Sequence, residues 1–195
     1  FSTIKAGVIG DVMLDTYMWG QVERISPEAP VPVVSLNKKE YRIGGAGNVA
    51  LNCKSLGAAV TILSVTGNDT DGMLLSELFD SNNIDTAYLV KSNTRKTISK
   101  TRIISRNQQM MRLDDEMTAP LSREDESKLL EQVRNYIAKE DPDIIIFEDY
   151  NKGVLTEKLI QEVIDLCKKA GVLTAVDPKR KNFFSYRHVD IFKPN

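Results

Sequence analysis

Five short apolar runs without polar alternation most constrain how this chain can fold. They lie at residues 6–10, 60–65, 143–147, 172–176 and 189–192. Strands buried on both faces have this pattern, because helices cover both sides of a parallel sheet. Amphipathic helical patterns separate most of the runs, and such strand–helix alternation is typical of a doubly wound fold. We therefore expect an α/β protein with a doubly wound, mostly parallel sheet.

The stretches between the runs carry helix signals. Ser122 is followed three residues later by Asp125, which matches a capping box at the start of a helix. A helical stripe over residues 155–167 precedes Gly171, as expected for a helix that ends in a left-handed glycine. Two further helices are expected at residues 46–57 and 70–81.

Two segments break the alternation of strands and helices, at about residues 31–43 and 96–114. The second segment alternates polar and apolar residues around a turn that contains Asn107, as a hairpin with one exposed face does. We expect both segments to form a small antiparallel β lid beside the main sheet. All 195 residues are then the N-terminal part of one domain. An exposed lid edge can pair with a second copy, so we expect a homodimer through the lid.

Composition excludes several classes of protein. The net charge of −1 provides no basic field for nucleic acid. No apolar run reaches the roughly 20 residues that a membrane span needs. The N-terminus lacks the pattern of an export signal, so a cytoplasmic location is expected. Cys53 and Cys167 stand alone in helical patterns and are interpreted as reduced core residues rather than a disulfide or metal pair.

Polar residues follow the apolar runs at the points where they end. Because the carboxyl ends of parallel strands meet at one edge of the sheet, and ligands bind there, these side chains are expected to lie together. Carboxylates combined with a lysine and an amide suit a site for hydroxyls, phosphate and a divalent ion. The residues are Asp11, Asp15, Asp149, Asp177, Lys179 and Asn195.

A glycine-rich segment, Gly44-Gly45-Ala46-Gly47-Asn48, opens the helix expected at residues 46–57. Glycines allow a ligand to approach the backbone, and a helix N-terminus favours anions or polar hydroxyls. No Gly-Lys-Ser/Thr follows, so the segment is not a P-loop. It loosely matches a dinucleotide fingerprint, yet residues 38–43 are too polar for the central strand that must precede one. A dinucleotide-binding α/β protein remains one alternative, and a simple turn at a helix start is another.

The glycine segment, together with Gly10-Asp11 and Asp15, resembles the N-terminal signature of ribokinase-like (PfkB) carbohydrate kinases. The resemblance spans essentially the whole chain. Residues 24–33 and 105–109 resemble the heptose-7-phosphate kinase branch, which is often fused to an adenylyltransferase. The resemblance implies a ribokinase-like fold whose C-terminal part is missing from this chain.

The implied reaction is phosphorylation of the anomeric hydroxyl of D-glycero-D-manno-heptose 7-phosphate by ATP with Mg²⁺, toward ADP-heptose and lipopolysaccharide precursors. A PfkB kinase for ribose, fructose phosphate or a nucleoside is the alternative within the family. A non-catalytic dimerisation module that pairs its lids edge to edge is a third interpretation.

The resemblance also implies roles for single residues. Sugar hydroxyls would be held by Asp15, Gly44, Gly45 and Asn48, while Asp11 and Asp149 are candidate substrate ligands at the same edge. Lys179 and Asp177 would lie toward the nucleotide phosphates, and Asn195 would begin an Asn-x-x-Glu element near magnesium. The catalytic base, the aspartate of a Gly-Ala-Gly-Asp motif, is expected beyond Asn195. Asn48 cannot replace it, because an amide is no base. No metal ligand is assigned.

A basic set, Lys100, Arg102, Arg106 and Arg112, falls on the lid segment. It is interpreted either as a solvated hairpin face or as a clamp for the phosphate that the substrate already carries, since arginine forks suit phosphate oxygens. His188 is expected in a loop and Trp19 in packing.

Overall fold

A five-stranded parallel sheet forms the body of the molecule, and the computed structural model describes residues 2–194. The strand order is β11–β10–β9–β1–β4, and every neighbouring pair is parallel. The strands are β1 (Lys5–Gly10), β4 (Ala59–Leu63), β9 (Ile144–Glu148), β10 (Leu173–Asp177) and β11 (Ile191–Phe192). They confirm the five predicted strands with small shifts at their ends. The predicted run at 60–65 is longer than β4, because the chain leaves the sheet at Ser64 and continues as β5 (Val65–Gly67), which pairs with β6 (Val90–Ser92).

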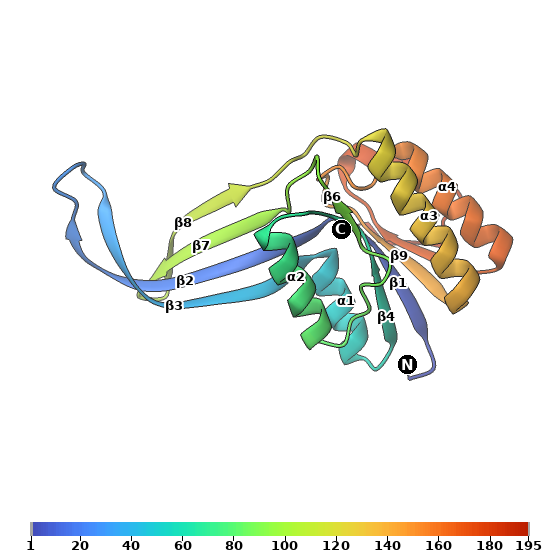
Figure 1. Cartoon of the computed structure of the whole chain (residues 1–195), viewed down its shortest axis with the longest axis horizontal. Helices are drawn as coiled ribbons and strands as arrows, with labels where there is room; N and C mark the ends of the chain where they lie inside the picture. Colours follow the sequence, from blue (N-terminus) through green and yellow to red (C-terminus); the bar gives the residue numbers. More distant parts are fainter. Residues whose placement is uncertain (1, 195) are drawn as a thin grey trace.

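Helices cover both faces of this sheet, as predicted. They are α1 (Ala46–Ser55), α2 (Thr70–Ser81), α3 (Arg123–Glu140) and α4 (Glu157–Ala170). Successive residues of a strand point to opposite faces. Val8 of β1 accordingly joins the apolar cluster with α1 and α2, whereas Ile9 joins the cluster with α3 and α4. Figure 1 shows α3 and α4 side by side and apart from α1 and α2.

The helix ends follow the sequence signals. Ser122 caps α3 by accepting a hydrogen bond from the Asp125 backbone N–H at 3.1 Å. Gly171 ends α4 in the left-handed conformation, with φ 74°. The predicted capping box forms only in one direction, because the Asp125 carboxylate accepts from the Ser92 hydroxyl at 2.8 Å instead.

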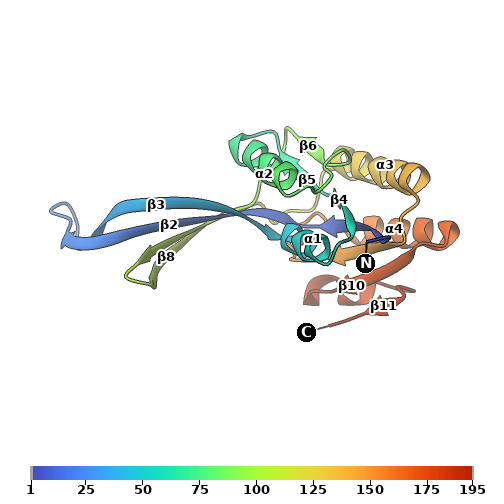
Figure 2. The same ribbon diagram turned by 90° about the horizontal axis from the view of Figure 1, so that it is seen from below.

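A second, four-stranded sheet extends as a long arm from the body (Figures 1 and 2). We call this sheet the lid. Its order is β3–β2–β7–β8, with β2 (Val12–Ile25), β3 (Pro32–Gly45), β7 (Ser99–Ser105) and β8 (Gln108–Asp115). The hairpin predicted within residues 96–114 is present, and Arg106 and Asn107 both have positive φ, as a two-residue primed turn requires.

The lid differs from expectation in two respects. Strand β2 was not predicted: the chain was expected to leave the sheet at Asp11, whereas it continues with hardly a break into a 14-residue strand. The antiparallel arrangement holds for the hairpins β2–β3 and β7–β8, but β2 and β7, which join them, run parallel. The lid is therefore a mixed sheet.

Several single-residue predictions can also be placed. Cys167 is buried in α4 and Cys53 is half-buried in α1, and both are free thiols. His188 is exposed in a loop. Trp19 stacks on Tyr17 within the lid, with ring centroids 5.6 Å apart. Over residues 2–194, no helix has the length and apolar character that crossing a membrane requires.

Candidate functional site

The lid joins the body at the carboxyl ends of the parallel strands, which we call the binding edge. β1 passes through Asp11 into β2, and β3 returns through Gly44 and Gly45 into α1. Gly45 has φ 60°, and a side chain there would collide with the Asp11 carbonyl oxygen. The same oxygen accepts the Ala46 N–H at 3.0 Å, which aims the N-terminus of α1 at the binding edge. Only glycine fits this turn.

Asp15 lies at the root of the lid beside these glycines. Its Oδ1 accepts a hydrogen bond from Arg102 Nη1 at 2.7 Å, and Gly44 lies so close to Oδ2 that a side chain there would overlap it. Asn48 is exposed on the first turn of α1. The structure thus brings together Asp15, Gly44 and Gly45, with Asn48 on the helix that the glycines open.

Asp11 has a different surrounding from the one expected of a substrate ligand. Its side chain is fully buried and accepts backbone N–H groups of Tyr150 at 2.9 Å, Lys152 at 3.0 Å and Val154 at 3.0 Å. Burial raises the pKa of the Asp11 carboxyl, while the three N–H donors oppose the rise. With both oxygens engaged by backbone N–H groups, Asp11 anchors the loop after β9.

Asp149 is likewise an anchor. It is buried, and its Oδ2 accepts from Asn182 Nδ2 at 2.8 Å and from the Tyr186 hydroxyl at 2.9 Å. Its Oδ1 accepts the Asn151 N–H at 2.8 Å. Asp149 therefore ties the loop after β9 to the short helix at Arg180–Ser185. Buried carboxylates must be satisfied internally, and these two are. Their contact with a substrate stays a prediction.

Two carboxylates end neighbouring strands at the binding edge. Glu148, the last residue of β9, pairs in register with Asp177, the last residue of β10. Burial and the nearby Asp177 raise the pKa of Glu148 to about 7, against the opposing effect of Lys179 and Lys193. Lys179 Nζ lies 5.4 Å from the centroid of the Tyr150 ring. Asn195, the other residue predicted here, lies outside the described residues.

Glu148 and Asp177 could supply two carboxylate ligands to a magnesium ion, whereas the described residues contain no cluster of three or more His, Cys, Asp or Glu side chains for a metal. Mg²⁺ binds few protein carboxylates and takes its remaining ligands from water and phosphate. Two neighbouring carboxylates beside Lys179 meet that description. Glu148 directly follows an apolar run at this edge, but it was not among the residues predicted to bind a ligand.

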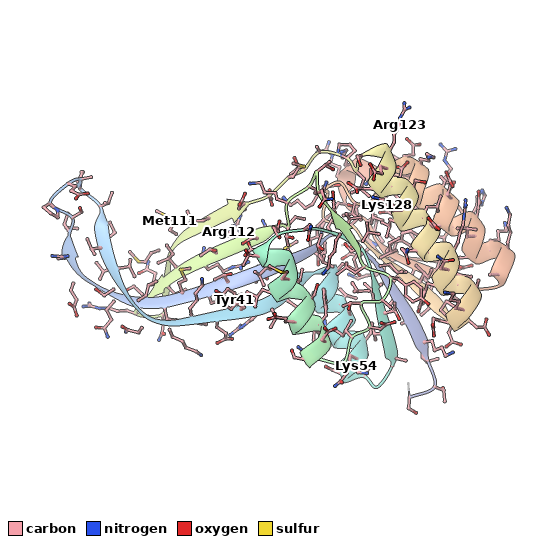
Figure 3. The ribbon with its side chains drawn as sticks, in the orientation of Figure 1. Tyr41, Lys54, Met111, Arg112, Arg123 and Lys128 are labelled. Atoms are coloured by element: carbon pink, nitrogen blue, oxygen red, sulfur yellow. The ribbon has the colours of Figure 1, made fainter. Side chains whose placement is uncertain are left out.

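The four basic residues predicted on the lid do not all lie together. Lys100 and Arg102 of β7 and Arg112 of β8 share one face of the lid, because Arg112 pairs in register with Arg102. Arg106 lies apart, exposed in the β7–β8 turn. Arg112 forms an ion pair with Asp114 at 2.8 Å. Figure 3 labels Arg112 and Met111 on the lid, with Met111 farther from the body.

Two further residues at the lid root, Arg95 and Glu116, were not predicted. Arg95 is buried, and its guanidinium donates to the carbonyl oxygens of Met117 at 3.0 Å, Ala119 at 2.9 Å and Lys152. Glu116 accepts hydrogen bonds from two lysines, one of them Lys152. Their partners are backbone groups or distant side chains, so no local pattern in the sequence marks them.

The strand that precedes the glycine segment bears on the dinucleotide alternative. That fingerprint needs a central strand of the parallel sheet before the glycines. The strand present is β3, an outer strand of the lid. A dinucleotide fingerprint also needs an acidic residue about 20 positions further on to hold the ribose. Asp69 lies at about that distance, but its side chain caps α2 by accepting the Gly72 N–H at 2.7 Å. The structure therefore opposes this alternative.

Comparison with known proteins identifies the relatives of the chain. The profile described as pfkB family carbohydrate kinase matches residues 4–195. The bifunctional protein HldE of Trichlorobacter lovleyi is 41% identical over 194 residues, which is 100% of this chain and 39% of that protein. The bifunctional protein HldE of Helicobacter pylori is 42% identical over 191 residues, 98% of this chain and 41% of its own length. The chain thus spans about two-fifths of these relatives.

Solved structures agree in fold. Ribokinase of Arabidopsis thaliana, complexed with ribose and ATP, superposes with a TM-score of 0.68 at 19% identity, covering 98% of this chain and 60% of that one. Phosphofructokinase-2 of Escherichia coli, in a tetrameric inhibited form, gives a TM-score of 0.74 at 18% identity, with 98% and 61% covered. At these identities the likeness establishes the ribokinase-like fold, of which the chain forms a part.

Proposed function

The chain belongs to the pfkB family of carbohydrate kinases, and on this premise we propose that it forms part of a heptose-7-phosphate kinase. The reaction is transfer of the γ-phosphoryl group of ATP to the anomeric hydroxyl of D-glycero-D-manno-heptose 7-phosphate. Relatives about 41% identical over the whole chain, all called bifunctional protein HldE, support this choice within the family.

One observation carries the proposal of a sugar site. Asp15 lies against Gly44 at the root of the lid, beside the glycine turn that aims α1 at the same point. A carboxylate accepts hydrogen bonds from sugar hydroxyls, while a helix N-terminus and an amide such as that of Asn48 donate them. We therefore assign Asp15, Gly44, Gly45 and Asn48 to the sugar.

Nucleotide and metal belong further along the binding edge. Lys179 would attract the phosphates of ATP, and Glu148 with Asp177 would hold Mg²⁺ there. When bound, the metal would offset the negative charge of the phosphates, as in other phosphoryl transfers. The residues of this chain would position the two substrates relative to each other.

The base that takes the proton of the anomeric hydroxyl is not assigned within residues 1–195. Asp11 and Asp149 are buried and engaged as anchors, so neither suits this task. We propose that the base lies in the part of the protein beyond Asn195. A cytoplasmic reaction follows from the use of ATP.

We also propose that the protein forms a homodimer through the lid. The face of the lid opposite Asp15 carries apolar side chains, among them Met111, 54% exposed, and Leu113, 52% exposed. A second copy of the lid would remove this surface from water.

Isothermal titration calorimetry on the full-length protein tests the substrate. Heptose 7-phosphate should bind more tightly than ribose, fructose 6-phosphate or a nucleoside. Tighter binding of one of the others would favour a different kinase of the same family.

A further inference from the structure

Lys152 is held at the binding edge from both sides of its backbone. Its N–H donates to Asp11 Oδ2 at 3.0 Å, and its carbonyl oxygen accepts from the buried Arg95 guanidinium. The four-carbon stem of a lysine is flexible, so the position of its ammonium group usually depends on a side-chain partner. In Lys152 the main chain is already fixed by hydrogen bonds of its own.

The ammonium groups of Lys152 and Lys100 meet at one carboxylate. Lys152 Nζ lies 2.6 Å from Glu116 Oε1, and Lys100 Nζ lies 3.1 Å from Glu116 Oε2. Lys100 comes from β7 of the lid and Lys152 from the loop after β9. The side chain of Lys100 is 12% exposed, that of Lys152 19% and that of Glu116 20%. Solvent therefore screens the charges of the cluster only in part.

Each lysine therefore contacts a different oxygen of the same anion. Phosphate accepts hydrogen bonds from ammonium groups at the same distances as carboxylate does, but it has three terminal oxygens and a larger charge. Burial raises the pKa of Glu116, yet the hydrogen bonds from Lys152 and Lys100 outweigh this, and its pKa lies below the usual value. The cluster is thus arranged to hold a charged acceptor.

Glu116 lies outside the strands, directly after the end of β8 at Asp115. The next residue, Met117, is fixed by its carbonyl oxygen to Arg95 at 3.0 Å. Rotation of the Glu116 side chain breaks no strand pairing. Lys100 is paired within the lid on both sides, by β2 and β8, and keeps its contact with Asp114 at 3.0 Å.

We propose that Lys100 and Lys152 form a phosphate subsite, and that Glu116 is an internal anion that occupies this subsite until the phosphate of the sugar substrate displaces it. The inference rests on the proposed function for the identity of the sugar phosphate. It replaces the four-residue clamp expected from the sequence, because Arg106 lies apart in the β7–β8 turn.

The position of the subsite favours the phosphate of the sugar over that of ATP. Lys100 pairs in register with Asp15, the residue that we assign to the sugar. Lys179, assigned to the nucleotide, lies beyond Tyr150 on the side of β10. One subsite joining lid and body would also make closure of the lid sensitive to a phosphorylated sugar.

The test compares Glu116→Gln with the unchanged full-length protein by titration calorimetry. The probes are inorganic phosphate, heptose 7-phosphate, unphosphorylated heptose and a non-hydrolysable ATP analogue. Loss of the competing charge should tighten binding of both phosphate and heptose 7-phosphate by about tenfold, the scale of one charge-assisted hydrogen bond. Binding of unphosphorylated heptose and of the ATP analogue should not change.

Two further variants make the result specific. Lys152→Met should weaken binding of inorganic phosphate and heptose 7-phosphate, the opposite direction to Glu116→Gln. Glu126→Gln is the matched control, because Glu126 pairs with Lys158 at 3.1 Å and is 12% exposed, but lies at the start of α3 away from the cluster. It should leave every affinity unchanged.

Unchanged or weaker phosphate binding in Glu116→Gln would overturn the inference, and so would tightening confined to the ATP analogue. Failure of the proposed function looks different. In that case heptose 7-phosphate does not bind, while Glu116→Gln still tightens inorganic phosphate and Lys152→Met still weakens it.

Discussion

Asp15 of β2 and Arg102 of β7 form an ion pair of 2.7 Å across the parallel pair of strands that joins the two hairpins of the lid. The guanidinium of Arg102 also lies over the Tyr17 ring, 5.1 Å from its centroid. The pair fixes one oxygen of the Asp15 carboxylate and leaves the other beside Gly44. The lid therefore orients the residue that we assign to the sugar.

The first prediction concerns the sugar site. Asp15→Ala and Asn48→Ala should each reduce affinity for heptose 7-phosphate by about tenfold or more, because each removes a hydrogen bond worth about 1–3 kcal/mol. Asn52→Ala, one turn further along α1, is the matched control and should bind normally. Calorimetry measures the affinities. Unchanged binding in both site variants would remove these residues from the sugar site.

The second prediction concerns the anchor beneath the site. Asp11→Asn places an amide N–H₂ against backbone N–H groups that now donate to a carboxylate. We expect the free energy of unfolding to fall by about 2–3 kcal/mol, the cost of leaving buried donors without an acceptor. Urea denaturation of the full-length protein measures it. A loss below about 0.5 kcal/mol, typical of surface substitutions, would show that the loop after β9 does not depend on Asp11.

The third prediction follows from the pKa of Glu148, which burial and Asp177 raise to about 7. A carboxyl whose pKa is raised in the folded state stabilises the fold fully at pH values below its unfolded pKa. This contribution to the free energy of unfolding is lost as the pH rises through the folded pKa of about 7, because the buried group then ionises. Glu148→Gln cannot ionise. It should therefore be more stable than the unchanged protein at pH 8, by no more than about 3 kcal/mol.

The same comparison at low pH supplies the control. The difference between Glu148→Gln and the unchanged protein should shrink toward pH 5, where Glu148 is protonated in the folded state. Chemical denaturation at pH 5, 7 and 8 without Mg²⁺ measures it. A difference that does not vary with pH would mean that Glu148 is ionised throughout this range.

The fourth prediction concerns assembly. Met111→Glu places a charge on the apolar face of the lid and should shift a dimer toward monomer, which sedimentation velocity detects at micromolar concentrations. Gln109→Glu adds the same charge to the same strand without removing apolar surface, and should leave the dimer intact. A monomeric unchanged protein would contradict the proposed dimer, and a dimer that persists in Met111→Glu would place the contact elsewhere.

The parallel sheet could be predicted from sequence because a strand buried on both faces consists of a continuous run of apolar residues. The runs that became β1, β9 and β10 contain few polar residues, and Gly171 marked the end of α4. β2 escaped prediction because its polar and apolar residues are mixed and no turn residue separates it from β1 except Gly10.

The site could be predicted only in part, for a related reason. Asp15, Gly44 and Gly45 were predicted because each lies in a motif, and the structure places them side by side. The contact of Asp15 with Arg102 joins residues 87 positions apart through a parallel pairing whose register no local pattern contains. The role of Asp11 as an anchor was not predicted, because its hydrogen-bond donors are backbone N–H groups, which nearly every residue carries. Arg95 was not predicted because its partners are backbone carbonyl groups, and Glu116 because its partners are lysine side chains distant in the sequence.

Phosphorus NMR of the full-length protein with Mg-ATP and a panel of sugars tests the central claim most directly. We predict a new anomeric phosphate resonance with heptose 7-phosphate, faster than with ribose or fructose 6-phosphate, and its loss in Asp15→Ala. Phosphorylation of another sugar in preference, transfer to a hydroxyl other than the anomeric one, or full activity of Asp15→Ala would contradict the account.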